Sequence, residues 1–170
     1  AFRQRVTNGP QFFADITPRP FQLRILESLA AARQNNSKRN LVVAATGTGK
    51  TVVSALDYKR FVDEAGRKEK LLFVVHRKEI LQQALGCFRS VMRDQNFGEL
   101  LIDGIEPQEW EHVFASVQSL RTRQPWNQLG ADHFRFVIVD EAHHGTASSY
   151  RPLFQYLKPE ILLGLTATPE

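Results

Sequence analysis

The stretch "NLVVAATGTGKT", residues 40–51, decides the fold class of this chain. Its first six residues form a short apolar run that predicts a buried β-strand. A turn with Gly47 and Gly49 follows, and apolar residues at helical spacing then lead to Gly66, which suits a helix C-cap. The helical series comprises Val52, Ala55, Leu56 and Val62. A strand that passes through a glycine-rich turn directly into a helix indicates an α/β protein.

The alternation of strand and helix continues through the rest of the chain. Apolar runs predict strands at residues 71–75, 112–117, 134–140 and 161–167, and helical periodicity predicts helices at 21–33, 80–92 and 148–157. A short polar helix or turn containing Trp126 is also expected. Continuous apolar strands that alternate with helices indicate a parallel sheet covered on both faces. We therefore expect one α/β domain that binds ligands at the carboxyl ends of its strands.

Composition limits the possible functions. The 170 residues are enough for one domain, and no apolar run approaches the roughly 20 residues of a membrane-spanning helix. The single cysteine, Cys87, excludes an intrachain disulfide, and we interpret it as a packed thiol in a reducing, cytoplasmic setting. The net charge of +4 permits an anionic partner such as nucleic acid without establishing one. Residues 1–18 predict an N-terminal arm, and the absence of an initial Met indicates a piece of a longer chain.

The glycine-rich turn is close to a phosphate-binding loop, whose pattern is Gly, four residues, then Gly-Lys-Ser/Thr. Ala44 replaces the first glycine, whereas Gly49, Lys50 and Thr51 match the pattern. The glycines allow successive backbone N–H groups to point at an anion, Lys50 can reach the β- and γ-phosphates, and Thr51 can coordinate Mg²⁺. The alternative is a glycine-rich turn with a surface lysine. Its position between a strand and an amphipathic helix favours phosphate binding.

A second cluster lies in "FVIVDEAHHG", residues 136–145. At the predicted strand end, Asp140 can hold Mg²⁺ and Glu141 can orient and deprotonate an attacking water. Zinc is the competing reading, because His143 and His144 follow at once. The cluster lacks the histidine spacing of "HExxH", and the other histidines are scattered. A solvated turn is the third reading, and the phosphate-binding loop makes it less favoured.

The segments "ATGTGKT", "DEAHH" and "LTATP", in this order, resemble motifs I, II and III of superfamily 2 helicases and translocases. The chain is similar to the first RecA-like (DEAD/DEAH-type) ATPase domain, and most similar to the branch of the res subunit of type III restriction enzymes. The resemblance covers about residues 19–169. It implies a P-loop NTPase fold, a RecA-like three-layer αβα sandwich with a mainly parallel sheet, with ATP and Mg²⁺ as ligands.

The resemblance also implies roles for individual residues. Gln22, in "RPFQ", is placed to recognise adenine, although an exposed glutamine at a helix start is the plain alternative. His76 and Arg77 are similar to motif Ia, and Ser116 and Gln118 to a later motif; both motifs touch the nucleic-acid backbone, and a solvated loop is the alternative for each. The predicted ATP-binding residues are Gln22, Thr46, Gly47, Thr48, Gly49, Lys50 and Thr51, and the catalytic residues are Lys50, Asp140 and Glu141.

Three residues are expected to couple hydrolysis to movement: His143, Thr166 and Thr168. No role is assigned to His144. The chain departs from the family pattern at Ala44, and no convincing glycine pair lies between motifs Ia and II, which leaves the nucleic-acid path open.

The resemblance implies a motor that moves on nucleic acid, DNA rather than RNA, once a second RecA-like domain of the same full-length chain supplies arginine fingers. Such arginines contribute about 10³ to 10⁵ in rate. We expect residues 19–170 to be the first domain only, and to bind Mg-nucleotide weakly and hydrolyse it poorly alone. The alternatives are an RNA helicase of the same superfamily and a P-loop phosphotransferase acting on a small molecule. No membrane partner is expected.

Overall fold

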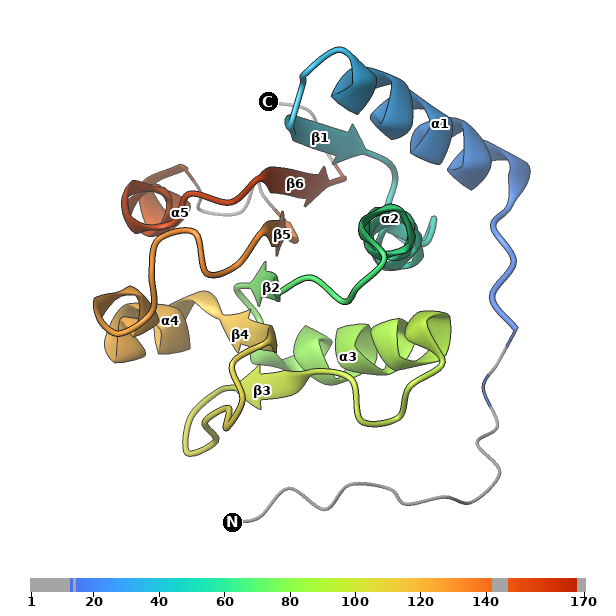
Figure 1. Ribbon diagram of the computed structural model, residues 1–170. Helices are drawn as coiled ribbons and strands as arrows, with labels where there is room; N and C mark the ends of the chain where they lie inside the picture. Colours follow the sequence, from blue (N-terminus) through green and yellow to red (C-terminus); the bar gives the residue numbers. More distant parts are fainter. Residues whose placement is uncertain (1–12, 14, 142–146, 168–170) are drawn as a thin grey trace.

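The computed structural model describes residues 13, 15–141 and 147–167, and its centre is a six-stranded sheet (Figure 1). The strand order is β1-β6-β5-β2-β4-β3, and every neighbouring pair is parallel. The strands are β1 (Arg39–Val43), β2 (Leu71–Val75), β3 (Glu99–Leu101), β4 (His112–Ser116), β5 (Phe136–Val139) and β6 (Ile161–Thr166). The helices are α1 (Pro20–Gln34), α2 (Lys50–Ala65), α3 (Lys78–Met92), α4 (Val117–Arg123) and α5 (Ala147–Tyr156), with a 3₁₀ turn at Pro125–Asn127.

Helices cover both faces of the sheet, so the predicted three-layer αβα sandwich is confirmed. Helices α1, α2 and α3 pack on one face and α4 and α5 on the other (Figure 1). In β2, Leu71 and Phe73 join the first core and Leu72 and Val74 the second, so the whole strand is buried. Burial on both sides explains why the central strands read as unbroken apolar runs.

Strand β3 was missed by the sequence analysis. It has only three residues at the edge of the sheet, and its first residue is the polar Glu99. The Glu99 carboxylate accepts hydrogen bonds from the N–H groups of Gln108 and Trp110, which shapes the β3–β4 connection. A strand this short carries no usable alternation of apolar residues. The other predicted strands are confirmed, with ends displaced by one or two residues.

The end of the predicted N-terminal arm carries neither helix nor strand where it is described. The Arg93 guanidinium, just after α3, lies 3.4 Å from Asp15 and 5.8 Å from the centre of the Phe13 ring. Ile16 packs on the first core. Residues 15–17 and 19 line a small cavity together with Gln22 and the loop that follows β1. In the described part of the chain, none of the helices has the length and apolarity to cross a bilayer.

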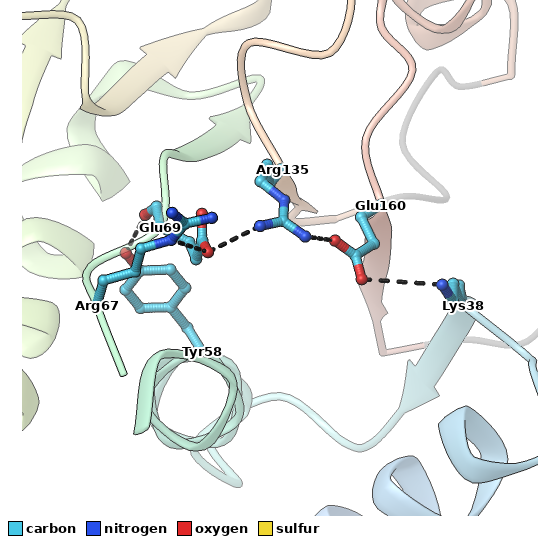
Figure 2. A network of polar contacts seen from close by, with 6 residues as sticks. All are labelled: Lys38, Tyr58, Arg67, Glu69, Arg135 and Glu160. Atoms are coloured by element: carbon cyan, nitrogen blue, oxygen red, sulfur yellow. Dashed lines mark hydrogen bonds and ion pairs between the residues drawn. The ribbon is translucent and has the colours of Figure 1, made fainter. Parts of the chain in front are cut away.

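A polar network ties the amino ends of the strands together (Figure 2). The buried Glu69 carboxylate accepts from Arg67 Nε at 2.9 Å and from Arg135 Nη1 at 2.8 Å. Arg135 also pairs with Glu160, whose other oxygen lies 3.8 Å from Lys38 Nζ. These residues lie at the amino ends of the strands, opposite to the carboxyl ends where parallel sheets bind their ligands.

A second ion pair holds α1 against α2. Both guanidinium Nη atoms of Arg33 donate to the Asp57 carboxylate, at 2.5 and 2.6 Å. Asp57 is almost fully buried, and this burial raises its pKa although Arg33 opposes the shift. A bidentate pair of this kind compensates a charge that the apolar interior would otherwise exclude. It fixes the helix that carries Gln22 at its other end.

Removing Arg33 is therefore expected to destabilise the fold. Arg33→Ala should lower the free energy of unfolding by about 3–5 kcal/mol, because Asp57 is left buried without its partner. Without Arg33 the pKa of Asp57 rises further, so the variant binds more protons folded than unfolded and becomes less stable as the pH rises. Urea unfolding at several pH values measures both effects. Lys59→Ala is the control, because Lys59 pairs with Asp63 at the exposed surface, where a pair contributes about 0.5 kcal/mol. Equal effects of the two substitutions would contradict the buried-pair account.

Candidate functional site

The loop between β1 and α2 has the backbone shape of a phosphate-binding loop. Gly47 and Gly49 have φ angles of 81° and 82°, in the left-handed region that favours glycine. Gly49 is the N-cap of α2, and its carbonyl accepts the Val53 N–H at 3.0 Å. Ala44 does not have a positive φ, which explains why alanine is tolerated there. The loop therefore directs backbone N–H groups and a helix N-terminus at one point.

Lys50 and the end of β6 are both anchored to Ala44. The Lys50 ammonium donates to the Ala44 carbonyl oxygen at 3.1 Å, which folds the lysine back over the loop. The Ala44 N–H donates to the carbonyl oxygen of Thr166 at 3.0 Å. Thr166 is buried at the end of β6, directly beside β1. The last residue of β6 is therefore in direct contact with the start of the phosphate-binding loop.

The predicted carboxylates follow β5 on the same edge of the sheet. Asp140 is 6% exposed, and its N–H donates to the Val74 carbonyl oxygen at 2.9 Å. Its Oδ1 accepts the Glu141 N–H at 2.8 Å. Glu141 has a φ of 54°, an unusual conformation for a residue that is not glycine. Asp140 and Glu141 both line the cavity described next.

One open cavity of about 480 Å³ unites the loop and the carboxylates. Part of the lining comes from α3 and includes Cys87, for which no sequence pattern indicated a place in the site. Burial raises the pKa of this thiol to about 11, so it stays protonated and unreactive at neutral pH. The predicted residues that line this cavity are Thr46, Gly47, Gly49, Lys50, Thr51, Asp140 and Glu141. A cationic side chain, backbone donors, a hydroxyl and two carboxylates thus converge on one volume.

Gln22, near the start of α1, contacts the loop between β1 and α2 and is 5% exposed. Its Oε1 accepts the Arg19 N–H at 2.9 Å, and its Nε2 donates to the Thr48 carbonyl oxygen at 3.0 Å. Gln22 is therefore a buried residue that joins α1 to the phosphate-binding loop, and the exposed alternative is wrong. With residues 15–17 and 19 and the loop, it lines a second cavity of about 300 Å³.

The predicted nucleic-acid contacts lie outside the 480 Å³ cavity but, like it, at the carboxyl ends of the strands. Arg77 and Gln118 are exposed, at the starts of α3 and α4. Ser116 is buried, and its hydroxyl caps α4 by accepting the Ser119 N–H at 3.1 Å. His76 is half-buried, with its ring 5.0 Å from that of Tyr150. Two of the four side chains are thus free to reach a backbone.

Three residues of the site lie outside the described residues: the predicted coupling residues His143 and Thr168, and His144. Within the described ranges, no group of three His, Cys, Asp or Glu side chains is placed to hold a metal ion. Tyr150 is a further residue in contact with the site that the sequence did not indicate. It lies on α5, and its hydroxyl donates to the Asp140 carbonyl oxygen at 3.1 Å. An aromatic residue in an amphipathic helix gives no signal for such a contact.

A parallel sheet with a glycine-rich loop after β1 and an Asp-Glu pair after β5 defines a P-loop domain of the RecA-like class. The model of the family described as "Type III restriction enzyme, res subunit" matches residues 15–170. The chain belongs to this family and is a domain of the superfamily 2 helicase type.

Comparison with individual proteins is consistent with this family. The chain is 30% identical over 166 residues to the Type I restriction enzyme EcoAI endonuclease subunit of Escherichia coli, covering 91% of this chain and 20% of that protein. It is 27% identical over 164 residues to the putative ATP-dependent helicase IRC3 of Saccharomyces cerevisiae, covering 89% and 23%. A nuclease-deletion mutant of the Type ISP restriction-modification enzyme LlaGI, in complex with a DNA substrate mimic, has a similar fold. Its TM-score is 0.71 at 21% identity, over 91% of this chain and 18% of that one. The chain thus spans about a fifth of the length of these proteins.

Proposed function

We propose that this chain is the ATP-binding motor domain of a superfamily 2 DNA helicase or translocase, which couples Mg-ATP hydrolysis to movement on DNA. The observation that carries the proposal is the 480 Å³ cavity, in which Lys50 and the loop glycines of one segment meet Asp140 and Glu141 of another. A solvated turn or a surface lysine would not require these side chains to share a volume. The family membership supports the same function.

The loop is suited to the triphosphate. The N–H groups around Gly47 and Gly49 and the N-terminus of α2 attract anionic oxygens, and the Lys50 ammonium adds a full positive charge beside them. Thr51 and Asp140 supply the hydroxyl and carboxylate oxygens that Mg²⁺ accepts alongside phosphate, and both line the cavity. Bound Mg²⁺ would neutralise charge on the phosphate oxygens. The donor set therefore fits Mg-ATP.

Glu141 is the proposed general base. Glu141 and Lys50 line the same cavity, so a water held between Glu141 and the terminal phosphate can lose its proton to Glu141. Asp140 does not compete for this role, because it is buried and its Oδ1 already accepts the Glu141 N–H. The two adjacent carboxylates thus have separate tasks, one toward the metal and one toward water.

The 300 Å³ cavity is the proposed place of the adenine. The Gln22 amide contacts Arg19 and Thr48 with one lone pair of Oε1 and one Nε2 hydrogen. An amide has a second lone pair and a second N–H hydrogen. These remaining groups match the donor and acceptor on the edge of adenine. Binding of a base there would act on the loop directly, because Gln22 holds the Thr48 carbonyl.

We propose that the motor moves along DNA. Arg77 and Gln118, at the carboxyl ends of the strands, would contact the DNA backbone. The similar LlaGI enzyme is in complex with a DNA substrate mimic, which favours DNA over RNA. The Thr166 carbonyl oxygen accepts a hydrogen bond from the Ala44 N–H. Thr166 is therefore proposed to transmit changes in the loop to the segment after β6. His143 and Thr168 keep their proposed coupling roles. A second RecA-like domain in the full-length protein is proposed to supply the arginine fingers.

The experiment that tests the function measures ATP hydrolysis by the full-length protein with duplex DNA, single-stranded DNA and RNA in parallel. The proposal predicts Mg²⁺-dependent hydrolysis that DNA stimulates more than RNA does. Stimulation by RNA alone would favour the RNA helicase. Hydrolysis or phosphate transfer that depends on a small acceptor and ignores nucleic acid would contradict the proposal.

Gly49→Ala is expected to weaken Mg-ATP binding at least about tenfold. An added Cβ would lie 2.5 Å from Gln22 Nε2, and alanine is strained at a φ of 82°. Gly66→Ala is the matched control, because Gly66 has a similar φ of 71° but nothing within 4 Å of its added Cβ. Both variants should lose about 1 kcal/mol of stability, and only Gly49→Ala should lose affinity in a nucleotide titration. Unchanged affinity in Gly49→Ala would contradict the proposal that the loop conformation at Gly49 is needed for nucleotide binding.

A further inference from the structure

The peptide group between Asp140 and Glu141 is held at both of its polar ends by side chains. Its carbonyl oxygen accepts a hydrogen bond from the Tyr150 hydroxyl at 3.1 Å. Its N–H donates to Asp140 Oδ1 at 2.8 Å. The orientation of this peptide sets the position of the Glu141 backbone from which the side chain projects. The two hydrogen bonds together therefore restrict the direction of the Glu141 side chain.

The conformation of Glu141 requires such support. Its φ of 54° lies in the left-handed region, where a side chain with a Cβ is disfavoured. Residues keep such conformations only where the surrounding structure imposes them, and they are concentrated at functional sites. The hydrogen bond from Asp140 Oδ1 is local to the turn. The bond from Tyr150 ties the turn to helix α5, in addition to the bond from the Asp140 N–H to Val74 of β2.

Tyr150 has the properties of a rigid support. It is 2% exposed, and its ring packs on the second core of the sheet. The ring also meets the His76 ring edge-on, with centres 5.0 Å apart. Tyr150 does not belong to the lining of the 480 Å³ cavity.

We propose that Tyr150 is a positioning residue for Glu141: its hydroxyl holds the Asp140–Glu141 peptide so that the Glu141 carboxylate faces the water to be deprotonated. This inference rests on the proposed function, since it concerns the base of that reaction. Through its ring, Tyr150 also links this turn to His76, at the end of β2 on the side proposed to face nucleic acid. One side chain thus contacts both the hydrolytic turn and the neighbouring strand end.

The test compares Tyr150→Phe with Tyr156→Phe in the full-length protein. Tyr150→Phe keeps the ring and removes only the hydroxyl; Tyr156→Phe makes the same change at a 48% exposed position of the same helix. We expect Tyr150→Phe to lower the kcat for DNA-stimulated ATP hydrolysis about tenfold, because a small displacement of a catalytic group has a large effect on rate. The affinity for Mg-ATP should stay within about twofold, and Tyr156→Phe should behave as wild type.

Two further readouts separate positioning from a general structural role. In a Glu141→Gln background, Tyr150→Phe should cause no further loss of turnover, because the residue through which it acts is already disabled. Amide hydrogen exchange without nucleotide should become faster at Glu141, while the Asp140 amide, bonded to Val74, is unchanged.

Wild-type kcat in Tyr150→Phe, or a loss confined to nucleotide affinity, would overturn the inference while leaving the proposed function intact. Unchanged exchange at the Glu141 amide would overturn it as well. A wild-type protein that binds and hydrolyses no ATP would instead contradict the proposed function, and the role of Tyr150 in turnover with it.

Discussion

Lys50→Ala is expected to lower the affinity for Mg-ATP by about 100-fold. A charged hydrogen bond to phosphate contributes about 1.5–3 kcal/mol, and the phosphate-binding loop has no second ammonium to replace it. Lys50 is already turned toward the loop by its 3.1 Å bond to the Ala44 carbonyl, so little ordering is needed on binding. A fluorescent ATP analogue, titrated at equilibrium in the presence of Mg²⁺, measures the loss.

The control for this experiment is Lys59→Ala. Lys59 lies on the same helix, and its ammonium pairs with Asp63 at the surface, 2.8 Å away. This variant removes one positive charge without touching the cavity, so it should bind the analogue as tightly as wild type. Equal losses in the two variants would show that net charge, and not the position of Lys50, controls binding. Full affinity in Lys50→Ala would reject the loop as the phosphate site.

Glu141→Gln is expected to separate binding from turnover in the full-length protein. Glutamine keeps the size and polarity of the side chain but cannot accept the proton of the attacking water, and general-base catalysis contributes about 10² to 10⁴ in rate. The variant should bind Mg-ATP as wild type does and hydrolyse it at least about 100-fold more slowly. Steady-state ATPase rates with saturating DNA, together with the nucleotide titration, provide both numbers.

Glu27→Gln provides the matched change at an exposed position of α1, away from the cavity, and should retain full turnover. Full turnover in Glu141→Gln would reject Glu141 as the base. A parallel loss of affinity and rate would instead assign Glu141 to nucleotide binding. These results decide between the two carboxylates, because Asp140 is buried and is proposed to act toward the metal.

The candidate nucleotide site could be proposed from the sequence because its chemistry requires residues that are adjacent in the sequence. Lys50 and Thr51 follow one strand directly, and Asp140 and Glu141 follow another. In a parallel sheet the carboxyl ends of all strands lie on one edge, so an alternating pattern of strands and helices is enough to bring the two segments together. In the structure the loop and the two carboxylate residues line one cavity, as this reasoning expects, and their roles stay predictions.

Contacts between distant segments could not be predicted in the same way. The bond from Tyr150 to Asp140 and the bond from Gln22 to Thr48 depend on how helices dock on the sheet, and periodicity records only which face of a helix is buried. Ser116 shows a second limit. A serine at a strand end suits both a phosphate contact and a helix cap, and only the geometry shows that its hydroxyl caps α4. Strand β3 was too short to leave a pattern.

The most direct test of the central claim is an experimental structure of this protein with Mg²⁺ and a non-hydrolysable ATP analogue. We predict that the triphosphate lies in the 480 Å³ cavity, with phosphate oxygens on the backbone N–H groups of residues 47–51 and on Lys50 Nζ, and the metal between Thr51 and Asp140. The Glu141 carboxylate should face the terminal phosphate across one water. A nucleotide bound elsewhere, or a cavity that stays free of nucleotide at saturating concentration, would contradict the assignment of this domain as an ATP-driven motor.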